Sequence, residues 1–278
     1  MRRRDFLALT LRSAAGLALC GGAVAWSSSG IVRLHRRTIH LPNLPPAFAG
    51  LKIALLSDFH HGEWISREFI RSAIRLANAQ MPDVTALTGD YIHRRTKWIE
   101  SCFREISALR APLGVFGVLG NHDHYGGASR ASRRALISSG AVDVTNTGVD
   151  LTRDGQTLRL GGVGDLWEEK QNLAAALGKK GKPGTAIILS HNPDYAERIS
   201  DPRVALVLSG HTHGGQICFP FIGAPIVPSR FQQKYRAGLC RAPNVPVFVT
   251  TGVGSSFPPI RLNCPPEVAL LTLSCGAA

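Results

Sequence analysis

Five short apolar runs in this chain each end in polar side chains that can bind a metal ion. The runs are rich in Val, Ile, Leu and Ala, a composition typical of buried strands. The runs with the polar residues that follow them are 53–57 with Asp58 and His60, 84–88 with Asp90, 115–119 with Asn121, His122 and Asp123, 186–190 with His191, and 205–209 with His211 and His213. This repeated unit predicts strands that all deliver polar groups at their carboxyl ends.

Helical spacing separates the first three runs. Apolar residues recur there at intervals of three and four, at Phe69, Ile70, Ala73, Ile74 and Ala77 and again at Phe103, Ile106 and Leu109. Alternating strands and helices predict an α/β fold, in which ligands gather at the carboxyl ends of the strands. Further strand-like segments at 158–160, 247–249 and 268–271 suggest a second sheet packed against the first.

The polar residues at the ends of these runs form a transition-metal ligand set without thiolates. Its members are Asp58, His60, Asp90, Asn121, His191, His211 and His213. Seven ligands are too many for one tetrahedral zinc and suit two metals about 3.5 to 4 Å apart that share a carboxylate. We expect one metal to take Asp58, His60 and His213, the other to take Asn121, His191 and His211, and Asp90 to bridge them around a hydroxide.

The ordered motifs resemble those of the calcineurin-like metallophosphoesterases. The matching motifs are Asp58-Phe59-His60, Gly89-Asp90, Gly120-Asn121-His122-Asp123, His191 and Gly210-His211-Thr212-His213. The resemblance implies a four-layer α/β/β/α sandwich and an enzyme that hydrolyses a phosphodiester or pyrophosphate bond through the metal-bridging hydroxide. It also implies that His122 donates a proton to the leaving oxygen and is oriented by Asp123. The ligand types allow manganese, iron or zinc, and we expect two manganese ions.

The sequence around Asp90 bears on the substrate. Residues 89–95 resemble the protein serine/threonine phosphatase form of the motif, but His93 and Arg95 depart from it and disfavour that activity. The chain looks more like the envelope branch of the family, which includes relatives of UDP-2,3-diacylglucosamine pyrophosphatases. A lipid- or envelope-linked phosphoester is therefore expected. The apolar segment 219–228, followed by Arg230, Lys234 and Arg236, fits either a lipid-touching loop or a buried strand pair with a proline-rich turn.

The N-terminal residues resemble a twin-arginine export signal. Arg3-Arg4 is followed by Asp5-Phe6-Leu7 and then by an apolar run from Ser13 to Trp26. Residues 1–25 are thus expected to be a signal peptide or a retained anchor that uses the twin-arginine export machinery, and residues 26–278 to be the catalytic domain. The expected location is the periplasm or the outer face of the bacterial cytoplasmic membrane.

The net charge of the chain limits the classes of molecule that it is expected to bind. The chain has 32 basic and 19 acidic residues, a formal net charge of +13, which suits anionic substrates or a phospholipid surface and peripheral membrane contact. A nucleic-acid partner is not expected, because the sequence has no stacking-aromatic pattern and aromatic residues make up only 7%. A non-catalytic metal-binding envelope protein is the alternative, and the intact His122 and Asp123 argue against it.

The sequence does not assign a single role to several residues that flank the ligand motifs. His61, His93 and His124 flank the motifs and are expected at the surface or behind the ligands rather than on substrate. Asp165 ends another strand-like run and is expected to cap a turn. The basic cluster 94–97 fits either an acidic-substrate contact or a solvated loop.

Overall fold

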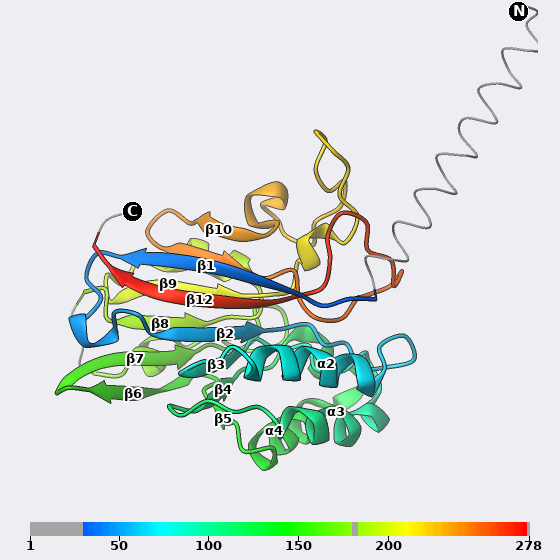
Figure 1. The fold of residues 1–278 in the computed structure, drawn as a ribbon, viewed down its shortest axis with the longest axis horizontal. Helices are drawn as coiled ribbons and strands as arrows, with labels where there is room; N and C mark the ends of the chain where they lie inside the picture. Colours follow the sequence, from blue (N-terminus) through cyan, green and yellow to red (C-terminus); the bar gives the residue numbers. More distant parts are fainter. Residues whose placement is uncertain (1–29, 180–182, 277–278) are drawn as a thin grey trace, which may run out of the picture.

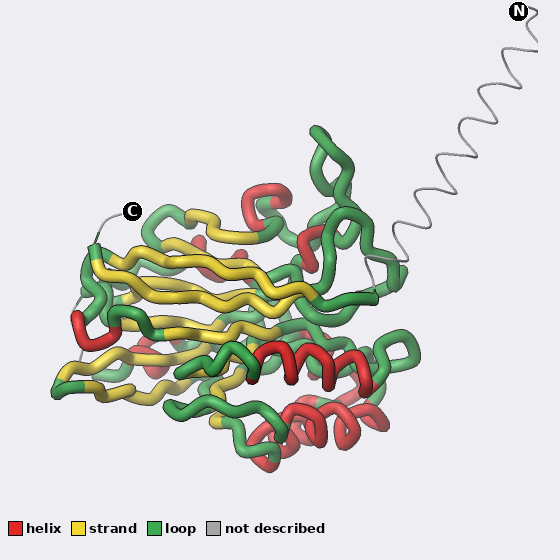
Figure 2. The backbone as a smooth tube through the Cα atoms, in the orientation of Figure 1, coloured by secondary structure: helices red, strands yellow, loops and turns green. Residues whose placement is uncertain are grey.

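Two six-stranded sheets face each other in the computed structural model, which describes residues 30–179 and 183–276 (Figures 1 and 2). Helices cover the outer face of each sheet, so the layers run α/β/β/α. The expected four-layer sandwich is confirmed. The first 29 residues, which hold the expected export signal, lie outside the described part of the chain.

The first sheet has the order β1-β12-β2-β3-β4-β5. Its strands are β1 (Arg33–Leu41), β12 (Glu267–Cys275), β2 (Lys52–Leu56), β3 (Val84–Leu87), β4 (Val115–Gly117) and β5 (Val142–Asp143). From β2 to β5 the pairs are parallel, while β12 runs antiparallel to β2. Segment 268–271 therefore belongs to this sheet and not to the second one: the chain returns to fill the place between β1 and β2.

The second sheet has the order β10-β11-β9-β8-β7-β6. Its strands are β6 (Thr147–Arg153), β7 (Gln156–Gly162), β8 (Ala186–Leu189), β9 (Val204–Ser209), β10 (Gly238–Arg241) and β11 (Pro246–Val249). Strands β7, β8, β9 and β11 are parallel, and the antiparallel β6 and β10 close the edges. The segments predicted at 158–160 and 247–249 are strands of this sheet, as expected.

Three longer helices cover the first sheet, and shorter elements cover the second. The α-helices are α2 (Arg67–Asn78), α3 (Ile99–Ile106), α4 (Ser129–Ser138) and α5 (Leu173–Leu177). The 3₁₀ segments are η1 (Pro46–Phe48), η2 (Thr96–Trp98), η3 (Asn121–Asp123), η4 (Tyr125–Gly127), η5 (Pro193–Arg198), η6 (His213–Gly215) and η7 (Gln232–Tyr235). Helix α2 begins where Ser66 accepts a hydrogen bond from the Phe69 amide, and it buries Ile70, Ala73, Ile74 and Ala77, the predicted apolar face.

Apolar side chains from both sheets fill the space between them. Leu55 of β2, Ala86 of β3, Leu189 of β8 and Leu208 of β9 belong to this central core and are fully buried. Alternate residues such as Ala54 and Leu87 face the outer helices, so both faces of these strands are apolar. This double burial explains why the strands appear in the sequence as continuous apolar runs and not as alternating ones.

No helix within residues 30–179 and 183–276 is long and apolar enough to cross a membrane. The five cysteines of the described ranges, Cys102, Cys218, Cys240, Cys264 and Cys275, are all free thiols.

Candidate metal centre

All seven candidate ligands lie at the same end of the sandwich, in the loops that follow the strands. Asp58 and His60 follow β2, and Asp90 and Asn121 follow β3 and β4, so four candidates come from the first sheet. His191, His211 and His213 follow β8 and β9 of the second sheet. All seven are buried. The topology thus brings together residues that span more than 150 positions of the chain, as the sequence predicts.

The first group consists of Asp58, His60 and His213. The two ring nitrogens His60 Nε2 and His213 Nε2 are 2.9 Å apart, and Asp58 Oδ1 lies 3.4 Å from His213 Nε2 and 3.9 Å from His60 Nε2. The donor atoms of all three residues therefore converge on one small volume.

The second group consists of Asp90, His191 and His211, with Asn121 beside it. His191 Nε2 lies 3.1 Å from His211 Nδ1, 3.1 Å from Asn121 Oδ1 and 3.3 Å from Asp90 Oδ2. His191 Nδ1 is 2.7 Å from the Thr88 carbonyl oxygen. A donor bond from Nδ1 to that carbonyl leaves the Nε2 lone pair directed into the group, an arrangement common behind metal-binding histidines.

Asp90 connects the two groups. Its Oδ2 is 3.5 Å from His60 Nε2 in the first group and 3.3 Å from His191 Nε2 in the second. Its other oxygen, Oδ1, accepts a 2.8 Å hydrogen bond from the main-chain N–H of His122. One carboxylate oxygen is therefore fixed by the backbone, and the other lies between the two groups.

The donor atoms fit metal ions. Two nitrogens that bind one metal at about 2.1 Å and at right angles are about 3 Å apart, close to the separations found within both groups. Such close approach of ring nitrogens is unfavourable when their lone pairs face each other with nothing between them. The set of oxygen and imidazole donors, without thiolates, suits Mn, Fe or Zn.

Five of the seven candidates have left-handed backbones. The φ angles of Asp58, His60, Asp90, His211 and His213 are 55°, 45°, 56°, 69° and 51°. Non-glycine residues rarely adopt this conformation, which costs about 1 kcal/mol or more at each position. Strain of this kind concentrates at functional sites because the surrounding structure holds the side chains in one direction.

Two glycines allow the loops to close around these side chains. A Cβ on Gly120 would lie less than 3 Å from Asp90 Oδ1 and 2.8 Å from His191 Cε1. A Cβ on Gly210 would meet Ser57 and Asp58 at similarly short range. Neither position has room for a side chain, which accounts for the glycine in the Gly-Asn-His-Asp and Gly-His-Thr-His motifs.

Burial and mutual charge set the protonation of the centre. Burial lowers the pKa of His60 and His213 well below the usual range and that of His211 to about 3, and it raises the pKa of Asp58 to about 6. Burial also disfavours charge on His191, but the Asp90 carboxylate outweighs it and raises the pKa of His191 to about 10. The histidines of the first group are thus neutral, as ligands must be, and Asp90 favours positive charge beside it.

Similarity to known proteins decides the family. The family model described as calcineurin-like phosphoesterase matches residues 51–215. The chain belongs to that family. It is 30% identical to the metallophosphoesterase YkuE of Bacillus subtilis, with 98% of each chain covered. It is 32% identical to the phosphodiesterase YaeI of Escherichia coli, again over 98% of each, and 32% identical to a metallophosphoesterase of Aquifex aeolicus over 92% of this chain and 97% of the relative. The protein is therefore a metallophosphoesterase, a hydrolase.

In this metallophosphoesterase the Asp123 carboxylate was expected to orient the His122 ring, but it hydrogen-bonds to main-chain amides. Its carboxylate accepts hydrogen bonds from the main-chain N–H groups of Gly120, Asp90 and Tyr91 at 2.8 to 2.9 Å, and Ile92 adds a longer one. His122 Nδ1 has no hydrogen-bond partner among the described residues. The short turn η3 directs Asp123 back onto the backbone, so this residue holds the two loops together and does not orient His122.

His122 itself borders the centre. Its ring packs edge-on against that of His60, with centroids 4.6 Å apart, and burial lowers its pKa. His93 lies against both rings, with centroids 5.7 Å from His60 and 5.3 Å from His122. One ring nitrogen of each of His60, His93 and His122 lies within 4.8 Å of the others, close enough for the three to bind an ion together. Of the two positions expected for His93, at the surface or behind the ligands, these ring contacts favour the second.

The other flanking residues have structural contacts. His61 Nδ1 and Nε2 each lie 2.8 Å from an oxygen, of the Ile65 carbonyl and of the Ser101 hydroxyl. His124 Nε2 lies 3.8 Å from Glu169. Asp165 caps a turn by accepting hydrogen bonds from the amides of residues 167 and 168, as predicted.

The basic cluster 94–97 is mostly engaged locally. Arg95 and Lys97 lie 3.4 and 3.7 Å from Glu63, and the Arg94 guanidinium lies over the Tyr125 ring. These contacts favour the solvated-loop interpretation over an acidic-substrate contact.

Arg261 is a residue near the centre that sequence reasoning missed. It is completely buried, and its guanidinium donates to the carbonyl oxygens of Thr251, Gly254 and Cys264. Its Nη2 also lies 3.3 Å from His213 Nδ1. The arginine therefore fixes the loop 251–264 against one candidate ligand. Nothing in its sequence context, a proline-rich stretch, distinguishes it from a surface arginine.

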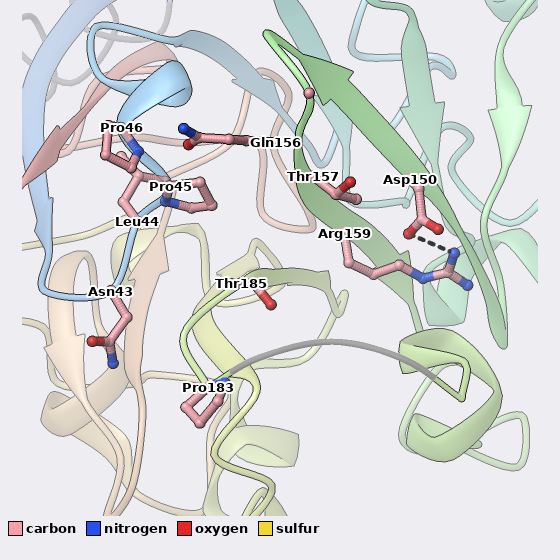
Figure 3. A pocket seen from close by; sticks show the side chains of 11 residues that line it. Asn43, Leu44, Pro45, Pro46, Asp150, Gln156, Thr157, Arg159, Pro183 and Thr185 are labelled. Carbon is pink, nitrogen blue, oxygen red and sulfur yellow. Dashed lines mark hydrogen bonds and ion pairs between the residues drawn. The ribbon is translucent and has the colours of Figure 1, made fainter.

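A cavity of about 1000 Å³ lies at the opposite end of the sandwich (Figure 3). The residues around it include Pro45, Gln156, Thr185 and the ion pair of Asp150 with Arg159, at the amino ends of β7 and β8. None of the candidate ligands lines it. The buried candidate centre is thus separate from this cavity.

Proposed function

We propose that this metallophosphoesterase hydrolyses a phosphodiester or pyrophosphate bond with two divalent metal ions. The residues that would hold them are Asp58, His60 and His213 for one ion and Asn121, His191 and His211 for the other, with Asp90 shared. The observation that carries the proposal is the position of Asp90 Oδ2, 3.5 Å from His60 Nε2 and 3.3 Å from His191 Nε2.

When bound, the two metals supply positive charge for the phosphoryl oxygens and lower the pKa of a water molecule towards neutrality. The chain holds this charge among buried side chains, where electrostatic interactions are stronger than in water. We assign to His122 the donation of a proton to the leaving oxygen. The support for this role is the partly exposed ring at the border of the centre, which is held by the main-chain bond to Asp90 and packed on His60. The mechanism needs no covalent enzyme intermediate.

The proposed ions are manganese, with iron and zinc as the other metals that the donor set accepts. Affinity alone does not select among these metals in a cell, so metal content has to be measured on the isolated protein.

The proposed location is the bacterial envelope. Arg3-Arg4 and the apolar run that follows support export through the twin-arginine machinery, to the periplasm or the outer face of the cytoplasmic membrane. We propose a lipid- or envelope-linked phosphoester as substrate and contact with the membrane surface. A UDP-2,3-diacylglucosamine pyrophosphatase is the specific form of this proposal. The phosphodiesterase name of the relative in Escherichia coli supports the diester class.

The test is hydrolysis by the purified, metal-loaded protein on a substrate panel. The panel holds bis(p-nitrophenyl) phosphate, a phosphomonoester, a glycerophosphodiester and UDP-2,3-diacylglucosamine, each tested before and after chelation. Diester or pyrophosphate turnover that chelation abolishes and Mn²⁺ restores is the expected result. Absence of turnover in protein shown to carry two metals would contradict the proposal and favour a metal-binding role.

A further inference from the structure

The loop between η6 and η7 places large apolar side chains in solvent. Phe221 is fully exposed, Ile222 and Ile226 are 75% and 78% exposed, and Phe219 is 44% exposed. In Figure 1 this loop, yellow in the colour scheme, extends away from the sandwich. Of the two interpretations that the sequence left open, the buried strand pair is wrong.

The loop is a built structure and not an apolar segment that failed to pack. Its inner residues Cys218, Ala224 and Val227 form a small buried cluster with Cys264. The amide of Phe219 and that of Gly223 each donate to the other's carbonyl, which closes the tip. One side of the loop thus carries a core of its own, while the apolar residues of the other side have no such cover.

A second loop extends the exposed apolar surface. Phe257 is 74% exposed and Ile260 is 45% exposed. The two loops are joined, because the Cys218 amide donates to the Leu262 carbonyl and the Leu262 amide donates to the Gln216 carbonyl. We call the exposed side chains of Phe219, Phe221, Ile222, Ile226, Phe257 and Ile260 the apolar tip. Scattered single apolar residues are normal on a protein surface, but a joined set of this size marks an interaction site.

The chain segment that carries the apolar tip is basic. From Gly214 to Pro266 it contains no acidic residue. Of its basic residues, Arg230, Lys234 and Arg236 follow the tip, with Lys234 paired to Glu197, whereas Arg241 lies at the amino end of the second sheet and Arg261 is buried. Arg230 is exposed just beyond the tip, and Arg33, also exposed, is held beside the second loop by a bond from its amide to the Pro266 carbonyl. An apolar surface with a basic rim is complementary to an anionic phospholipid bilayer, which offers acyl chains beneath negative headgroups.

The apolar tip lies at the same end of the molecule as the metal centre. Gly214 to Gln216 connect His213 directly to the tip, and the Cys264 thiol donates to the His213 carbonyl. The described chain also begins at this end, because β1 runs parallel to β12 and β12 runs antiparallel to β2. Residue 30, the first of the described chain, therefore lies on the same side as the apolar tip.

We propose that the apolar tip docks this protein on an anionic phospholipid bilayer and holds the metal centre towards the headgroups. The side chains of Phe221, Ile222 and Ile226 enter the boundary between headgroups and acyl chains, and the exposed Arg33 and Arg230 meet the lipid phosphates. This proposal rests on the proposed function only for the envelope location, since the tip contains no candidate metal ligand.

The test measures how deeply the tip enters a bilayer, in the full chain. One tryptophan is introduced at the tip, Phe221→Trp, or at the far end, Met81→Trp. The two positions are matched, since Met81 is 77% exposed and both residues have positive φ angles of 65° and 48°. Each protein is mixed with vesicles of equal parts phosphatidylglycerol and phosphatidylcholine that carry bromine on their acyl chains, and quenching beyond that of the wild type is recorded.

We expect the emission of the tryptophan at position 221 to fall at least twofold and that at position 81 to stay unchanged. Attachment through residues 1–29 alone would leave both unquenched and would overturn the proposal. The double variant Phe221→Asn/Ile226→Ser should lower the partition coefficient of the protein onto these vesicles about tenfold. The control variant Met81→Asn should leave the partition coefficient unchanged. A reversible dimer in sedimentation velocity that the tip variant abolishes would make a second copy the occupant, and this too would overturn the proposal.

These outcomes are separate from those of the proposed function, because quenching does not depend on hydrolysis. An active protein whose tip stays unquenched loses only the docking proposal. A quenched tip in a protein without turnover contradicts only the hydrolytic proposal.

Discussion

The two ends of the sandwich differ in how they present polar groups. At the carboxyl end of the strands the candidate ligands are buried, their donor atoms lie within 4.8 Å of one another in each group of three, and five of the seven have strained backbones. At the amino end an open cavity of about 1000 Å³ is lined by loop residues, by Gln156 and Thr157 of β7, and by an ion pair whose Asp150 side chain is 59% exposed. This cavity is therefore not the place where the groups able to do chemistry are concentrated. Burial of polar groups together with backbone strain locates the centre better than volume does.

An aspartate-to-asparagine substitution made at each end compares the two ends directly, and the largest loss of turnover is expected at the carboxyl end. Asp90→Asn removes the charge of the oxygen between the two groups, and we expect turnover to fall to the level of the metal-free protein with loss of at least one metal per chain. Asp150→Asn breaks only a partly exposed ion pair, so turnover should be unchanged and the free energy of unfolding should change by less than about 1 kcal/mol. Turnover rates and metal content are measured for both variants. Similar losses of turnover and metal in the two variants would contradict the distinction drawn between the ends.

His122→Gln sharpens the comparison within the carboxyl end. If the ring donates a proton to the leaving oxygen, kcat should fall about 10²- to 10³-fold on an alkyl diester while both metals stay bound. The loss should be much smaller on bis(p-nitrophenyl) phosphate, whose phenolate leaves readily without a proton. Equal losses on the two substrates would indicate a positioning role in place of proton donation.

Gly120→Ala tests whether the close packing of the loops matters. The added methyl group would meet Asp90 and the ring of His191, so these side chains must move by several tenths of an ångström or more. We expect kcat to fall about 10- to 100-fold and the metal to dissociate more readily, since small displacements of reacting groups are costly. Gly30→Ala is the control, because a Cβ there meets nothing within 4 Å. Wild-type turnover of Gly120→Ala would show that the loops tolerate a side chain.

The smallest effect concerns His35 of β1, a histidine that is not a candidate metal ligand. His35 Nδ1 lies 3.3 Å from Glu267, and the hydrogen bond with Glu267 raises the pKa of His35 against the opposing effect of burial. Its contribution to stability is therefore complete below pH 6.5, the ordinary value, and is lost as the pH rises through the raised pKa. Burial alone would raise the pKa of Glu267, but its hydrogen bonds with His35 and Thr250 lower it, so its own contribution is lost only in acid.

Because the His35 side chain is 43% exposed, the loss between pH 5.5 and pH 8.5 should be below about 1 kcal/mol. Denaturant unfolding at the two pH values measures it, and His35→Gln should remove this part of the pH dependence. A variant with the wild-type pH dependence would assign the effect to another group.

The sequence predicts the placement of the candidate ligands because strand direction determines it. A residue such as Asp90 or His191 directly after a buried parallel strand has little choice of location. The sequence does not predict the direction of a side chain within a short turn, and Asp123 therefore binds amides where a contact with His122 was expected. Nor does an apolar run encode which sheet it joins, so segment 268–271 was assigned to the wrong one. The exposure of Phe221 and the burial of Arg261 depend on tertiary contacts that local composition does not specify.

Each proposed metal would draw its ligands from both sheets, and this has a consequence for assembly. Asp58 and His60 belong to the first sheet while His213 belongs to the second, and Asp90 and His191 divide in the same way. On this proposal neither half of the sandwich could form a centre alone, so an ion would be captured only after the two sheets had met across their common core. Once captured, the ion would act as a cross-link between layers that are otherwise joined largely by apolar contact. Removal of the ions should then loosen the contact between the sheets before it disturbs the pairing of strands within either one.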